Sequence, residues 1–219
     1  MSATAPRCAP LELVADPGTA AGRAEDWRTE TVVQQWEPEH QLIGALMWLT
    51  ADAARPILDL VPDTAMWRPA NRWALEIIRT LVEQARDPNP VVVLATARGR
   101  ACSLAPEPDA VPTAARHHQF AVHLADAYTQ TVSPLAAPTY AREVLDEAYR
   151  RAVRFHGIRM QQYAECGSDR ADITAYLTTM RAELADLWRR AETAAKPAQA
   201  RTQRLHATPA AAPGRPPPP

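Results

Sequence analysis

The chain has 219 residues, enough for one well-buried domain with tails or for two small domains. Apolar residues make up 47% and charged residues 22%, as in an ordinary globular protein. A formal net charge of -1 excludes an overall electrostatic attraction to nucleic acid or to an anionic membrane. Three widely spaced cysteines without a CxxC pair argue against a disulfide framework and against a zinc site: Cys8, Cys102 and Cys166.

The sequence also bears on the compartment. No apolar run reaches the roughly 18 residues that a membrane span requires. The N-terminus lacks the basic and apolar regions of a signal peptide. Together with the sparse cysteines, which are typical of reduced thiols, these features predict a cytoplasmic protein without membrane contact.

The two ends differ from the middle of the chain. Residues 1–35 mix Ala, Pro, Gly and acidic residues without a periodic apolar pattern. Residues 193–219 are rich in Pro and Ala and end in four consecutive prolines, which donate no backbone hydrogen bonds. We expect both segments to be disordered.

Residues 36–137 show helical periodicity and predict a compact helical bundle. One amphipathic helix follows Pro38, a shorter one ends before Pro62, and a third begins at Arg68-Pro69. Two more are expected at 91–98 and 114–129, although the VVVLA run at 91–95 is also compatible with a strand. Gly44, inside the first helix, predicts a close approach by another helix, with a tolerated surface glycine as the alternative.

Residues 138–192 predict a long antiparallel helical hairpin. Its first helix extends from about Pro138 to about Cys166, with a seam at Leu145, Ala148, Ala152 and Phe155. Gly167 is a suitable stop, and Ser168 a suitable N-cap for the second helix. The expected fold is therefore all-α, a compact bundle followed by a hairpin.

The second hairpin helix has more apolar surface than one partner helix covers. Its side chains predict a partner interface, with the hairpin's own core as the alternative: Ile173, Tyr176, Leu177, Met180, Leu184, Leu187 and Trp188. A symmetric homodimer or a higher homo-oligomer would cover the surplus with one self-complementary patch.

Charged and metal-ligating residues give weaker signals. Five arginines on the first hairpin helix are candidates for DNA contact or for an ordinary solvated face: Arg142, Arg150, Arg151, Arg154 and Arg159. His117, His118 and His123 lack a converging ligand, so we expect solvated surface histidines and no metal site. No Cys/His nucleophile, GxSxG or HExxH pattern is present.

Three stretches carry a family resemblance. Residues 39–47, EHQLIGALM, are similar to a motif EQxxLGALL. Residues 66–74, MWRPANRWA, are similar to F-Y-R-P-x-H-R-x-I/L, with Asn71 in place of the histidine. Residues 123–145 are similar to YLxxLxxxxPSxANxxxYARIVRE, without the usual preceding Gly-Gly. In order and spacing, residues 36–192 resemble the N-terminal domain of DnaB-type replicative DNA helicases.

This resemblance implies a role in DNA replication. In that family the hairpin mediates subunit pairing and contact with the primase, and a separate RecA-like domain hydrolyses ATP. The present chain has no GxxxxGK[ST] phosphate loop, and its only lysine, Lys196, stands between Ala195 and Pro197. We therefore expect no enzymatic activity, no cofactor and no small-molecule substrate.

Three functions follow as hypotheses. The first is a replication protein that pairs with itself, or with a helicase or primase, and contacts DNA through its partner. The second is the N-terminal part of a split or truncated helicase whose ATPase acts in trans. The third is a DNA-binding regulator that uses the arginines of the hairpin.

Overall fold

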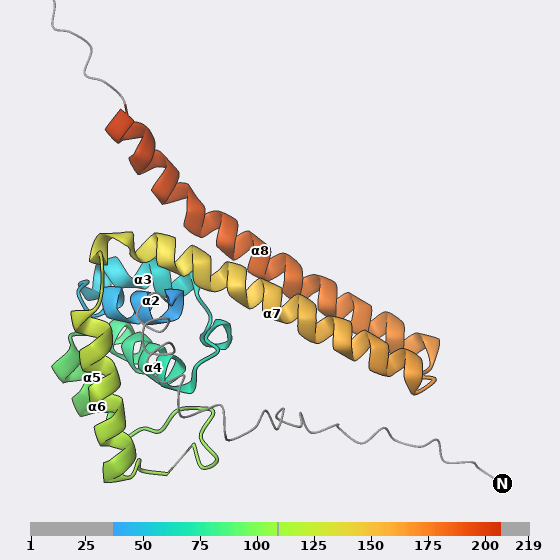
Figure 1. Ribbon diagram of the computed structural model, residues 1–219, viewed down its shortest axis with the longest axis horizontal. Coiled ribbons are helices and arrows are strands. Elements are labelled where there is room, and N and C mark those ends of the chain that lie inside the picture. Colours follow the sequence, from blue (N-terminus) through green and yellow to red (C-terminus); the bar gives the residue numbers. More distant parts are fainter. Residues whose placement is uncertain (1–36, 109, 207–219) are drawn as a thin grey trace, which may run out of the picture.

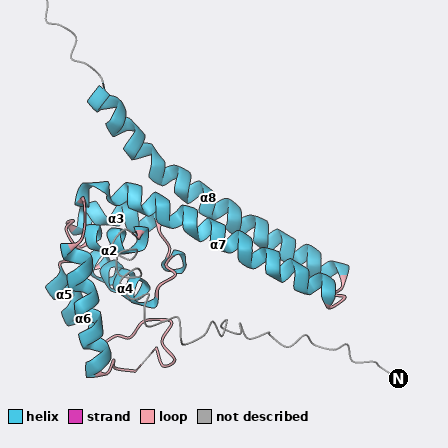
Figure 2. Ribbon diagram, viewed as in Figure 1, coloured by secondary structure: helices cyan, strands magenta, loops and turns pink. Residues whose placement is uncertain are grey.

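The computed structural model describes residues 37–108 and 110–206, and within these ranges every regular element is a helix (Figure 2). The globular part contains five α-helices and two short 3-10 helices: α2 (Pro38–Leu46), α3 (Ala51–Leu60), η1 (Asp63–Ala65), α4 (Pro69–Glu83), α5 (Pro90–Ala97), α6 (Ala114–Thr129) and η2 (Pro134–Ala136). The hairpin consists of α7 (Ala137–Glu165) and α8 (Arg170–His206). The predicted all-α class is confirmed.

Local signals set most helix starts. The side chains of Thr50, Asn89 and Thr113 each accept a hydrogen bond from a backbone amide three residues later, at the starts of α3, α5 and α6. Proline occupies the first turn of α2, α4 and α5, where its missing N–H has no cost. The VVVLA run therefore belongs to a helix, as predicted.

The turn of the hairpin differs by one residue from the prediction. Gly167 ends α7 with a φ of +61°, the left-handed conformation that favours glycine. The expected N-cap was Ser168, but α8 begins at Arg170 and Ile173 N donates to the carbonyl of Asp169 at 3.1 Å. The N-cap position therefore falls on Asp169, whose carbonyl accepts the first helical hydrogen bond.

The last helix is longer than predicted. It continues past 192 to His206, so part of the segment expected to be disordered is helical. Ala191, Ala194 and Ala195 are buried against the rest of the protein, and alanine is the best helix former. Residues 207–219, like residues 1–35, lie outside the described part, so the expectation of disorder there stays a prediction.

The core of the globular part lies among α2, α3, α4 and α6. Leu42, Ile43 and Leu46 of α2 are fully buried. On α4 the buried set recurs at helical spacing: Leu75, Ile77, Ile78, Leu81 and Val82. Trp73 stacks on Phe120 of α6 with ring centroids 4.0 Å apart, and its indole N–H donates to the carbonyl of Arg100 at 2.8 Å.

The hairpin projects from this core. In Figure 1, α7 and α8 lie side by side and extend away from the globular part, and the C-terminal end of α8 runs back past the start of α7 and diverges from it. Arg190 of α8 donates to the carbonyls of Asp59 and Leu60 at 3.0 and 3.2 Å. These carbonyls lie at the end of α3 and have no partner within the helix. This contact attaches the second hairpin helix to the bundle.

Gly44 confirms the predicted close approach. A Cβ atom at this position would lie 1.9 Å from Thr131 Oγ1 and 2.1 Å from the carbonyl oxygen of Ala127. The second of these atoms is backbone, so it cannot rotate away. Only glycine therefore allows α2 to pack against the end of α6.

We expect Gly44→Ala to lower the free energy of unfolding by about 1–3 kcal/mol, the usual cost of overpacking a core. Gly157→Ala is the matched control, because Gly157 also lies inside a helix but has no atom within 4 Å of the added Cβ. It should raise stability by about 0.5–1 kcal/mol. Urea denaturation of the two variants measures both changes, and equal effects would contradict the packing argument.

Candidate functional site

A buried carboxylate lies where the globular part meets the hairpin. The side chain of Glu39 is almost fully buried and accepts hydrogen bonds from the backbone amides of Trp67 and Arg68 at 2.7 and 3.1 Å. These amides precede α4, whose N-cap residue makes no side-chain capping bond. Glu39, which lies in the first turn of α2, therefore caps the start of α4.

The same carboxylate is connected to two further elements. Asn71 Nδ2 donates to it at 3.2 Å, and Asn71 Oδ1 lies 2.8 Å from Nε2 of His123 on α6. Since this amide oxygen can only accept, His123 carries its proton on Nε2. Arg151 of α7 lies 3.7 Å from Glu39 Oε1 and donates to the carbonyl of Ala65. Glu39 thus connects α2, α4, α6 and α7.

Burial governs the titration of the histidines in this cluster. It lowers the pKa of His123 to about 4, and the neighbouring charges of His40 and Arg68 act in the same direction. Burial also lowers the pKa of His40, whose ring lies 5.4 Å from that of His123. The expectation of solvated histidines is wrong for His123 and for His117, which lies 3.0 Å from the carbonyl of Leu94, and holds for His118, which is exposed.

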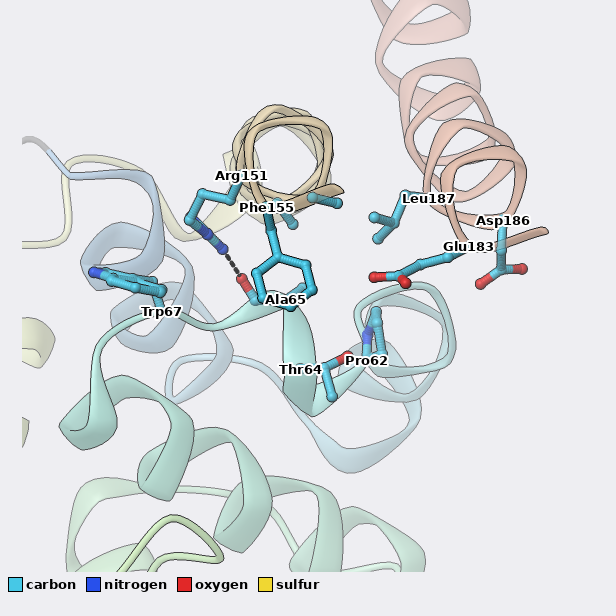
Figure 3. A pocket seen from close by; sticks show the side chains of 11 residues that line it. Pro62, Thr64, Ala65, Trp67, Arg151, Phe155, Glu183, Asp186 and Leu187 are labelled. Atoms are coloured by element: carbon cyan, nitrogen blue, oxygen red, sulfur yellow. Dashed lines mark hydrogen bonds between the residues drawn. The ribbon is translucent and has the colours of Figure 1, made fainter. Parts of the chain in front are cut away.

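A groove of about 350 Å³ opens beside this cluster (Figure 3). One wall is the turn between α3 and α4, one is α7 and one is α8. The lining residues are Pro62, Thr64, Ala65, Trp67, Ala148, Arg151, Ala152, Phe155, Glu183, Asp186 and Leu187. The interior is mainly apolar, with two carboxylates on the α8 side.

Two aromatic side chains in the groove are unusually accessible. The exposed fractions are 70% for Trp67 and 55% for Phe155. The guanidinium of Arg151, which is bound by Glu39 and by the carbonyl of Ala65, lies 5.8 Å from the centroid of the Trp67 ring, within the range of a cation–π contact. An apolar floor with one fixed cation and a carboxylate rim suits an apolar peptide segment better than a small polar substrate.

The predicted interface residues of α8 separate into three environments. Ile173, Tyr176, Leu177, Met180 and Leu184 are half-buried, consistent with packing along α7. Leu187 is buried and lines the groove, whereas Trp188 is 58% exposed and contacts Tyr149 edge-on at 6.0 Å. The seam thus contributes to the hairpin's own core, and Leu184 and Trp188 leave apolar surface beside it.

The seam predicted on α7 needs one correction. Phe155 was placed inside the hairpin by its spacing, but the neighbouring His156 is the buried residue. His156 Nδ1 lies 2.6 Å from the hydroxyl of Tyr176, and its Nε2 lies 3.2 Å from Glu183. With His156 on the inner side of α7, the adjacent Phe155 lies on the helix face that lines the groove. Helical spacing cannot distinguish two adjacent residues when the inner position is polar.

The five arginines do not form one surface. Arg142, Arg150, Arg154 and Arg159 are exposed, but Arg159 lies about 140° around the helix from Arg154. Arg142 pairs with Asp146 at 3.7 Å, and Arg159 contacts Gln162 at 3.3 Å. Arg151 is occupied by Glu39 and Ala65, so it acts as a structural residue. DNA contact by these arginines stays a prediction.

Among residues 37–108 and 110–206, no group of three or more His, Cys, Asp or Glu side chains is arranged to hold a metal ion. No helix in the same part of the chain is long and apolar enough to cross a membrane. Burial raises the pKa of the Cys102 thiol, which makes it a poor nucleophile.

An all-helical domain with a projecting hairpin has known counterparts. No protein-family model and no curated protein matches the chain. Among solved structures, it is similar to the N-terminal domain of DnaB helicase from Mycobacterium tuberculosis, with a TM-score of 0.53 and 19% identity. The match covers 68% of this chain and 96% of that chain. The expected resemblance to the DnaB N-terminal domain is confirmed in the fold.

We predict that the stability of the protein falls as the pH is lowered from about 6.5 towards 4. His123 has a pKa near 4 when folded, below the value of about 6.5 when unfolded, so the unfolded state binds more protons in this range. Each unit of difference corresponds to about 1.4 kcal/mol. His40 contributes in the same direction.

The measurement is the free energy of unfolding of His123→Gln between pH 6.5 and 5. The free energy of unfolding of this variant should depend less on pH than that of the wild type. The variant His118→Gln, at an exposed position, should retain the wild-type slope. If His123→Gln and the wild type have equal slopes, the histidine is not held neutral by the fold.

Proposed function

We propose that the chain is a non-enzymatic DNA-replication protein that associates with itself and binds a replicative helicase or a primase through its hairpin. The similarity in fold to the N-terminal domain of DnaB helicase supports a role connected with replication. The observation that carries the proposal is the exposed apolar surface on the projecting hairpin. An element that extends from the bundle and retains large apolar side chains in water is suited to pairing.

The proposed pairing surface lies on the side of the hairpin where Trp188 contacts Tyr149. Val153, one turn after Tyr149 on α7, is 45% exposed, and Leu184, one turn before Trp188 on α8, is half-buried. These four residues define the pairing patch. A two-fold symmetric arrangement would use the same patch on both copies and leave no surface for further growth.

Two alternatives stay open. In the first, the chain is the N-terminal part of a split or truncated helicase and an ATPase joins it in trans. In the second, the chain is a DNA-binding regulator. The scattered arginines of α7 and the net charge of -1 give the second alternative little support. Partner capture from a cytoplasmic extract with the wild-type chain and with a pairing-patch variant separates a replication adaptor from both.

We predict that Val153→Glu combined with Trp188→Glu abolishes self-association, because two charges would be buried in an apolar contact without partners. Sedimentation at high micromolar concentration should show a dimer or a larger oligomer for the wild type and a monomer for the double variant. Helical content should be unchanged, since both side chains are about half exposed.

Val122→Glu is the matched control for this experiment. Val122 is equally exposed on a helix but belongs to α6, outside the hairpin, so its replacement should leave the oligomer intact. A wild-type chain that sediments as a monomer at these concentrations would rule out homodimerisation.

We also predict that the purified chain does not hydrolyse ATP or unwind DNA, because its sequence contains no phosphate loop. The assay compares the wild type with Lys196→Ala, which removes the only lysine. ATP hydrolysis that co-purifies with the wild-type chain and is lost on replacement of one of its own residues would refute the non-enzymatic assignment.

A further inference from the structure

The chain enters its described part directly beside the groove. The carboxylate of Glu37, the first described residue, lies 2.5 Å from Nε of Arg68. Arg68 adjoins Trp67, which lines the groove and is held by Glu39. Glu37, to which the preceding residues are attached, is therefore paired with the residue next to a groove-lining side chain.

Those preceding residues are rich in large apolar side chains. Residues 27–36 read WRTETVVQQW and contain Trp27, Val32, Val33 and Trp36. Residues 1–35 as a whole have no periodic apolar pattern, but at their end Val32 and Val33 precede Trp36 by four and three residues, a spacing that suits one helical face. Ten residues span about 15 Å as a helix and at most about 35 Å when extended, so the segment is long enough to follow the groove.

The groove offers matching chemistry. The flat faces of the Trp67 indole and the Arg151 guanidinium, held near each other, can stack against another indole. Phe155 and Leu187 provide an apolar floor for aliphatic side chains. A volume of about 350 Å³ suits one large aromatic group with a smaller apolar neighbour rather than a whole domain.

We propose that residues 27–36 dock into this groove of the same chain, with Trp36 against Trp67 and Arg151 and with Val32 and Val33 against Phe155. Tethering favours this occupant, because a directly attached segment has an effective concentration in the millimolar range. A free peptide or a second copy would need a comparable concentration to compete. The groove and the pairing patch use different side chains, so this inference stands or falls independently of self-association.

Limited proteolysis of the full chain tests the proposal. Trypsin can cleave after Arg28, inside the segment, and after Arg23, outside it. Docking should slow cleavage at Arg28 by about tenfold relative to Arg23, after normalisation to a synthetic peptide of residues 20–36, since cleavage follows the population of the open form. Equal normalised rates at the two sites would overturn the proposal.

Substitutions in the groove locate the protection. Phe155→Glu should remove the protection, so that the ratio of the cleavage rates at Arg28 and Arg23 equals the ratio in the free peptide. Ile158→Glu, on the same helix and similarly exposed but not lining the groove, should retain the protection. If both variants lose the protection of Arg28 against cleavage, or if neither does, the segment does not occupy the groove.

Two further measurements complete the test. Trp36→Ser alters only the segment and should also abolish the protection of Arg28 against cleavage. This variant tests the proposal even if circular dichroism shows that Phe155→Glu has lost helical content. Protection should not change on hundredfold dilution, because the contact is intramolecular. Protection that disappears on dilution would mean that the segment occupies a second copy, and would overturn docking within one chain.

Discussion

The structure depends on the buried carboxylate of Glu39. A charge taken out of water is strongly destabilising unless hydrogen bonds and an opposite charge compensate for it. Here two backbone amides, the amide of Asn71 and the guanidinium of Arg151 do so. The same carboxylate caps α4, which begins with a proline and has no side-chain cap of its own. Because its ligands come from α4 and α7, the same group fixes the angle at which the hairpin leaves the bundle.

The hairpin is attached at a second place, and the groove lies at this joint. Arg190 of α8 and Arg79 of α4 donate to carbonyls at the end of α3, which have no partner within that helix. With Arg151 on the carbonyl of Ala65, both hairpin helices are tied to the turn between α3 and α4. The turn between α3 and α4 is therefore held by polar contacts to both hairpin helices, whereas the floor of the groove is apolar. A surface whose shape does not depend on the occupant binds without the cost of ordering its own side chains.

The sequence predicted the helices well because their signals are local. The prolines at helix starts, the stop at Gly167 and the close approach at Gly44 depend on neighbours in the chain or on the absence of a side chain. The joint was not predictable in the same way, because Glu39 contacts residues 28 and 29 positions away. The spacing that placed Phe155 in the seam assumed an apolar interior, but the interior there is the His156–Tyr176 pair. The extension of α8 beyond residue 192 includes the buried Ala194 and Ala195, and burial of this kind is a tertiary contact that composition does not indicate.

Single residues at the joint between the bundle and the hairpin determine which elements are in contact and which side chains face outwards. An asparagine side chain carries both a donor and an acceptor, so Asn71 can bind Glu39 and His123 at once, where the resembling motif has a histidine. This keeps α6 attached to the cluster although one motif residue differs. On α8, Leu187 and Trp188 point about 100° apart, so one enters the groove and the other contacts Tyr149 outside it. The proposed docking and the proposed pairing therefore take place on different sides of one hairpin, and neither needs the side chains of the other.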